Sequence, residues 1–72
     1  MDKQKLLKLF GKNVKIARIK TDLTQEQLAE KMNVSQNYIA GIECGRANMS
    51  LWKIYELAIN LQCSTSELVN FS

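Results

Sequence analysis

The chain has 72 residues and a net charge of +3, and it contains three glycines and no proline. Because 46 % of its residues are apolar, we predict one small, compact domain over residues 1–72 and no extended disorder. No apolar run reaches the roughly 18 residues that a membrane span requires, and the lysine-rich start lacks a signal peptide's apolar core. We therefore expect a cytoplasmic protein that does not enter the membrane.

Charge is divided unevenly along the chain. Residues 1–20 contain seven basic residues and one acid, whereas residues 21–72 contain three basic residues and six acids. Such an asymmetry is typical of a protein with a surface that meets phosphate, but a lysine face can also serve only for solvation. Both interpretations remain open from composition alone.

The first predicted helix begins at an N-cap, Asp2, and ends near Lys20. Apolar residues at helical spacing define its core face, namely Leu6, Phe10, Val14 and Ala17. Lysines recur at spacings of three and four on a separate stripe, namely Lys5, Lys8, Lys12 and Lys15.

The second and third predicted helices lie within residues 24–44 and are joined by only a few residues. Thr24 and Gln27 have the spacing of a capping box, and Leu28 and Ala29 begin the buried side that follows. Ser35 is suited to cap the third helix, which ends at Gly45. Two short helices with a tight connection indicate a helix-turn-helix, although corners of this kind also occur without DNA binding.

Two further helices follow. The fourth is predicted from a cap at Ser50 to about Leu61, with a core row of Leu51, Ile54, Ala58 and Leu61. The fifth is a short helix that begins with a second capping box, Ser64 to Glu67. With no strand pattern in the chain, we predict an all-α fold, a compact five-helix bundle that contains a helix-turn-helix.

The third helix is predicted to present a polar face to solvent. If Ile39 and Ile42 face the core, the outward side carries Gln36, Asn37, Tyr38, Ala40 and Gly41. Gln and Asn side chains can each bond to adenine N6 and N7 in the major groove, and a small side chain can meet a thymine methyl. Gly41, whose cost in a helix is about 1 kcal/mol, is expected to let the backbone approach DNA. The alternative is that these amides are simply solvated.

The fourth helix also carries a second apolar row, and we predict that it forms a homodimer interface. Its members are Trp52, Tyr55 and Ile59, with Phe71 near the chain end. The alternative is that Tyr55 and Ile59 only widen the core face while Trp52 lies flat on the surface. A symmetric dimer would read a palindromic site whose halves are about one helical turn apart.

The sequence LTQEQLAEKMNVSQNYIAGIECG resembles the Cro- and phage-repressor-type helix-turn-helix family, which has a lambda-repressor-like fold. The segments FGKNVKIARIK and NMSLWKIYELAINLQCSTSEL resemble its first helix and its last two helices. Within the family, Y-I-x-G-I-E followed by N-x-S is similar to the short controller proteins of restriction–modification systems. The resemblance implies a sequence-specific regulator of transcription that binds double-stranded DNA, either a controller or a phage-type repressor.

The resemblance also implies roles for individual residues. Thr24 and Gln25 would hold a DNA phosphate, and Ser35 would join Gln36 and Asn37 in reading base edges. Tyr38 and Asn48 would contact base or backbone, and Arg18 would form a structural ion pair with Glu43.

The chain also departs from the family. Many relatives have a basic residue at the positions of Gly41 and Ala47, and a proline in place of Met49. Attraction to the DNA backbone is therefore assigned to Arg46, Lys53 and the ends of the lysine stripe.

Other functions have less support in the sequence. A protein-interaction module of the same fold, such as an antitoxin or adaptor, is the main alternative to a DNA-binding regulator. An enzyme is not expected, since there is no histidine, no glycine-rich phosphate loop and no base paired with Cys44 or Cys63. Two cysteines cannot supply the roughly four ligands of a zinc site, so we expect free thiols that pack as small residues, with no metal and no cofactor. No small-molecule effector site is evident.

Overall fold

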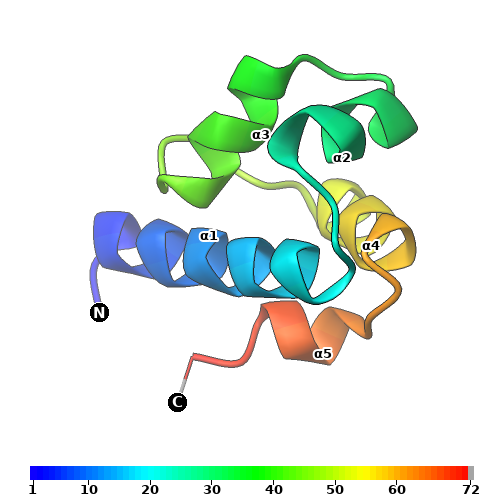
Figure 1. Ribbon diagram of the computed structural model, residues 1–72. Coiled ribbons are helices and arrows are strands. Elements are labelled where there is room, and N and C mark those ends of the chain that lie inside the picture. Colours follow the sequence, from blue (N-terminus) through cyan, green and yellow to red (C-terminus); the bar gives the residue numbers. More distant parts are fainter. Residues whose placement is uncertain (72) are drawn as a thin grey trace.

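The computed structural model describes residues 1–71, which form five helices and no strand (Figure 1). The helices are α1 (Lys3–Lys20), α2 (Gln25–Met32), α3 (Gln36–Glu43), α4 (Leu51–Asn60) and α5 (Thr65–Leu68). The long helix α1 has α2 and α3 on one side and α5 on the other. The predicted all-α bundle with a helix-turn-helix is confirmed.

Each helix begins with a side-chain oxygen that accepts a hydrogen bond from the amide three residues later. The five N-caps are Asp2, Thr24, Ser35, Ser50 and Ser64. The capping box at Thr24 is complete, since the Thr24 amide donates to Gln27 Oε1 at 2.9 Å and the Gln27 amide donates to Thr24 Oγ1 at 3.0 Å. At Ser64 the forward bond of the predicted box is present, from the Glu67 amide at 3.3 Å. The polar residues between the apolar runs therefore set where the helices start.

Helices α1 to α4 also end alike, each followed by a residue in the left-handed conformation. These residues are Asp22, Asn33, Gly45 and Gln62, with φ values between 56° and 78°. After each of them the next amide bonds back over the end of the helix, as Arg46 N does to Gly41 O at 2.8 Å. This arrangement satisfies carbonyls that would otherwise lack a partner and turns the chain sharply into the next element.

The core contains apolar residues from all five helices. Its buried members are Phe10, Val14, Ala17, Leu28, Ala29, Ile39, Ile42, Leu57, Ala58, Leu61 and Leu68. Two predicted core residues lie elsewhere: Leu6 is at the exposed edge of α1, and Leu51 is 82 % exposed, while Leu57 is completely buried. The difference between Leu51 and Leu57 follows from the position of α2. This helix meets the C-terminal end of α4, where Lys31 Nζ is 3.5 Å from Asn60 O. The first turn of α4 extends past this contact.

Gly11 allows α1 and α3 to pack closely. A Cβ atom at Gly11 would lie 2.3 Å from the backbone oxygen of Ile42 and 2.6 Å from that of Glu43. Both neighbours are backbone atoms, so they cannot move aside by a change of side-chain rotamer. The C-terminal end of α3 is therefore held against the middle of α1 at a distance that only glycine permits.

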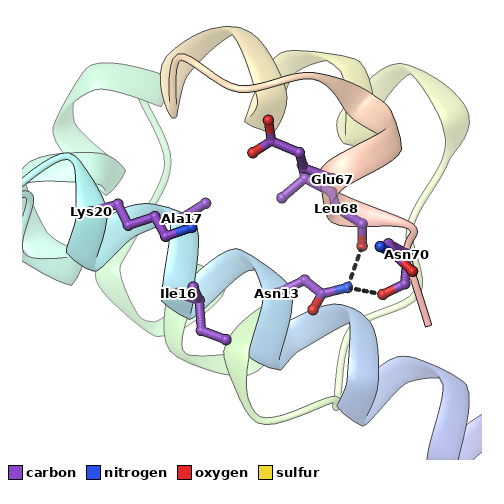
Figure 2. Close-up of a pocket in the computed structure, with 7 residues that line it drawn as sticks. All are labelled: Asn13, Ile16, Ala17, Lys20, Glu67, Leu68 and Asn70. Carbon is purple, nitrogen blue, oxygen red and sulfur yellow. Dashed lines mark hydrogen bonds between the residues drawn. The ribbon is translucent and has the colours of Figure 1, made fainter. Parts of the chain in front are cut away.

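The Asn13 side chain ties the C-terminal segment to α1 (Figure 2). Asn13 Nδ2 donates to the backbone oxygens of Leu68 and Asn70, at 2.9 Å each. The same residues border a small surface pocket whose wall also includes Lys20 and Glu67. The Asn13 amide is thus engaged in holding the chain end, which places α5 against α1.

The two cysteines are free thiols and occupy different environments. Cys63 is half-buried against the core, as expected of a small packing residue, and burial raises the pKa of its thiol. Cys44 is exposed, so the prediction of a packing role is wrong for this residue. The reason is that Cys44 caps the C-terminal end of α3, where the chain leaves the core. Among residues 1–71, no helix is both long and apolar enough to cross a membrane.

Candidate nucleic-acid interface

The turn between α2 and α3 helps to determine which residues of α3 face the core and which face outward. Asn33 adopts the left-handed conformation with φ 57°, and Ser35 caps α3 two residues later. Ile39 and Ile42 then point into the core, both essentially inaccessible to solvent. Because these two residues fix the rotation of α3 about its axis, they also fix which residues face outward.

The outward face of α3 is polar and contains small residues. Gln36 and Asn37 are exposed, while Tyr38 and Ala40 are half-buried at its sides. The backbone of Gly41 is covered, yet a Cβ atom built there meets nothing within 4 Å. Both observations are explained if neighbouring side chains cover the Gly41 backbone while its Cβ direction faces solvent. The missing side chain then leaves a gap on the surface and no cavity in the core.

Three of the predicted contact residues already have partners within the protein. The hydroxyls of Ser35 and Thr24 accept the capping bonds, from the amides of Tyr38 at 3.1 Å and Gln27 at 3.0 Å. Each hydroxyl hydrogen is still available to donate. The Gln25 amide group turns inward and donates to Glu43 Oε1 at 3.1 Å. The backbone N–H of Gln25, in the first turn of α2, has no intrahelical acceptor.

Arg18 and Glu43 form an ion pair that joins α1 to α3. Arg18 Nε lies 2.6 Å from Glu43 Oε2, and a second guanidinium nitrogen lies 3.1 Å from Oε1. The side chains are only 11 % and 3 % exposed, and Arg18 also donates to the backbone oxygen of Leu23 at 2.8 Å. The guanidinium thus connects three segments from inside the molecule, behind the outward face of α3.

Basic and polar side chains are exposed on the elements next to α3. Arg46 and Asn48 are exposed on the connection from α3 to α4, and the lysine stripe of α1 is exposed along its length. Lys8 of that stripe lies beside Gly45, so the N-terminal part of α1 approaches the C-terminal end of α3.

Lys53 lies near the opposite end of α3. Its Nζ is 5.7 Å from the centre of the Tyr38 ring and 2.8 Å from Glu56 Oε1. The sequence prediction identified Lys53 but did not assign a role to Glu56, whose spacing of three residues from Lys53 was the available signal.

The predicted apolar row is an exposed surface on α4. Its residues are Trp52, Tyr55 and Ile59, and the misassigned Leu51 extends it at the start of the helix. The rings of Trp52 and Tyr55 pack at 5.6 Å between centroids. We refer to these four residues as the α4 apolar surface. The alternative that Tyr55 and Ile59 widen the core face is wrong, since both are exposed.

Phe71 occupies a neighbouring cleft and not the α4 apolar surface itself. It is half-buried and packs against the core in a cleft that it shares with Leu6, Phe10 and Ile54. The cleft between α1 and α4 therefore receives part of the Phe71 ring, and Phe71 does not lie in one row with Trp52, Tyr55 and Ile59 as predicted. Ile54 borders this cleft and Tyr55 borders the next, so α4 separates the two.

The chain is similar to known proteins in sequence and in fold. The chain is 40 % identical over 62 residues to an uncharacterised HTH-type transcriptional regulator, y4dJ, of Sinorhizobium fredii, which covers 86 % of this chain and 80 % of that protein. It is 34 % identical over 65 residues to control protein C.BamHI of Bacillus amyloliquefaciens, with coverage of 89 % and 80 %. The crystal structure of the restriction-modification controller protein C.AhdI from Aeromonas hydrophila matches with a TM-score of 0.80 and 35 % identity, covering 86 % of this chain and 94 % of that one.

The profile of the helix-turn-helix family matches residues 14–68, from the middle of α1 to the end of α5. This range includes both helices of the motif and most of the core that holds them. The chain therefore belongs to the helix-turn-helix family of DNA-binding transcriptional regulators.

Proposed function

We propose that the protein binds a palindromic operator as a homodimer, with α3 of each copy in the major groove, and so regulates transcription. The observation that carries this proposal is the outward face of α3, where Gln36 and Asn37 are exposed beside the gap at Gly41. Two exposed amides on a helix that is rigidly packed from behind are suited to bidentate bonds with adenine. Ser35 contributes its hydroxyl hydrogen, and Ala40 meets a thymine methyl.

The surrounding residues hold the DNA backbone in this proposal. Thr24 and the backbone N–H of Gln25 bind one phosphate at the N-terminal end of α2, where the helix dipole also favours an anion. Arg46, Asn48 and Lys53 contact the backbone on the other side of α3. These contacts position the helix, whereas the α3 amides supply the sequence preference. Arg18 and Glu43 contribute by fixing α3 against α1.

Dimerisation is assigned to the α4 apolar surface, with the cleft of Phe71 beside it. Four large apolar side chains are exposed together on one helix, and tryptophan and tyrosine are favoured at the centres of interfaces. A two-fold interface uses the same surface on both copies, and two half-sites read together bind far more tightly than one.

Two relatives named control proteins are covered over 80 % or more of their own length, whereas the immunity repressor of Bacillus phage phi105, 42 % identical, is covered over 41 %, so we propose a controller-type regulator in preference to a phage-type repressor. We propose no enzymatic activity, since the polar residues of the site are donors and acceptors suited to base edges and phosphate. The proposed site of action is the cytoplasm.

The α4 apolar surface also supports a second function, that of a protein-interaction module. Fluorescence anisotropy of a labelled duplex between 50 and 200 mM salt separates the two. Binding to DNA releases about 0.9 counterions per phosphate contact, so affinity should fall steeply as salt rises. An operator selected from random duplexes provides the specific target, and a random duplex is the control. No salt-dependent binding to either duplex would refute the proposed function and favour the interaction module.

A further inference from the structure

Lys53 occupies a position that the stability of α4 does not favour. It is the third residue of the helix, close to the positive end of the helix dipole, where a cation is disfavoured. It also precedes its partner Glu56, and this order gives the weaker of the two helical pair orientations. The local helix therefore gives no reason for a lysine here.

Two groups nevertheless hold the Lys53 ammonium in a defined place. Glu56 Oε1 forms an ion pair with Nζ at 2.8 Å, with the two side chains 23 % and 31 % exposed. The Tyr38 ring lies below, with 5.7 Å between its centre and Nζ. The interaction with Glu56 raises the pKa of Lys53 above its ordinary value, so the pair stabilises the charged form of the lysine.

We infer that Glu56 restrains Lys53 in the free protein and lowers the affinity for duplex DNA, because its carboxylate competes with a DNA phosphate for the same ammonium. This inference rests on the proposed function, which places Lys53 beside the DNA backbone. Tyr38 belongs to the first turn of α3, next to Gln36 and Asn37, so the ammonium is already close to the base-reading face. When DNA binds, the Lys53 ammonium leaves Glu56 and pairs with a phosphate. Part of the free energy of the ammonium–phosphate attraction is then used to break the Lys53–Glu56 pair.

The expected effect is uniform across DNA sequences. A phosphate contact carries no base information, so the competition should weaken binding to operator and random duplex by the same factor. Partly exposed ion pairs of this kind correspond to about a 1.4- to 5-fold change in an equilibrium constant. Glu56 thereby lowers the affinity for every duplex by this factor and leaves the ratio between operator and random DNA unchanged.

The test is a double-mutant cycle with Glu56→Gln, Lys53→Gln and the double variant, measured on operator and random duplexes between 50 and 200 mM salt. Glu30→Gln is the matched control, since it removes an exposed acid on α2 and changes the net charge equally. We expect Glu56→Gln to tighten binding about 1.4- to 5-fold on both duplexes. The same change should have no effect once Lys53 is glutamine, and Glu30→Gln should leave affinity close to wild type. Thermal melting and sedimentation should show each variant folded and in the same oligomeric state.

Two outcomes would overturn the inference while leaving the proposed function intact. One is a Glu56→Gln variant with wild-type affinity, and the other is equal tightening with and without Lys53. Tightening by Glu30→Gln to the same extent would also overturn it, since net charge would then explain the effect. If wild-type protein bound no duplex, the proposed function would fail, and the inference with it.

Discussion

Replacement of Gly41 by alanine is expected to stabilise the fold and weaken operator binding at the same time. A Cβ atom at this position meets nothing within 4 Å, so the added methyl introduces no strain in the free protein. Alanine is favoured over glycine inside a helix by about 0.5–1 kcal/mol, which corresponds to a rise in melting temperature of about 2–8 °C for a domain of this size. The gap that is empty in the free protein faces the proposed position of DNA, where the same methyl would be crowded.

The size of the binding effect follows from that crowding. A methyl group forced into a well-packed contact costs about 1–3 kcal/mol, which is about a 5- to 150-fold loss of affinity for the operator. Urea denaturation followed by circular dichroism measures the first effect, and anisotropy of the labelled operator measures the second. A larger side chain, in Gly41→Leu, should weaken binding further without unfolding the protein.

Gly11→Ala is the matched control, because it makes the same chemical change in another helix. There the new Cβ would lie 2.3 Å from the backbone oxygen of Ile42, so this variant should lose stability where Gly41→Ala gains it. Destabilisation by Gly41→Ala would contradict the geometry of α3. A stabilised Gly41→Ala variant that binds its operator as tightly as wild type would refute the proposed close approach of the α3 backbone to DNA.

Four other substitutions test the ion pair, the turn after α4 and the proposed dimer. Arg18→Met leaves the buried carboxylate of Glu43 without its partner and should cost about 3–5 kcal/mol in urea denaturation; unchanged stability together with lost DNA binding would instead make Arg18 a contact residue. Gln62→Gly replaces a non-glycine residue in the left-handed conformation and should raise the free energy of unfolding by about 1 kcal/mol. An unchanged melting temperature would show that Gln62 is not strained in this turn. Trp52→Glu or Ile59→Asp should give folded monomers with weaker operator binding, whereas a wild type that sediments as a monomer at micromolar concentration and binds its operator with a Hill slope of one would rule out the dimer.

Local sequence signals predicted the helix starts and the motif accurately. The caps at Thr24 and Ser35 depend on side chains that bond within one turn, so spacing alone reveals them. The outward face of α3 followed from Ile39 and Ile42, because two buried residues fix the rotation of a short helix. These features involve neighbours in sequence, where helical geometry determines which residues meet.

The features that the sequence did not predict depend on how the helices cross. Leu51 and Leu57 both fit the apolar face of α4, and only the place where α2 meets that helix shows that Leu57 is the buried one. The need for glycine at position 11 arises from the approach of α3 to α1, which no local pattern encodes. Likewise, the contact of Lys53 with the Tyr38 ring joins residues of different helices.

The central claim is that Gln36 and Asn37 read bases, and the most direct test compares their alanine variants on two duplexes. Affinity for the selected operator and for a random duplex is measured at one salt concentration, for wild type, Gln36→Ala and Asn37→Ala. Each exposed amide can be removed without loss of core packing, so the variants should remain folded. Each is predicted to lose about 1–3 kcal/mol of binding free energy on the operator and almost none on the random duplex. Equal losses on the two duplexes would contradict the claim, because the amides would then contribute only to non-specific binding.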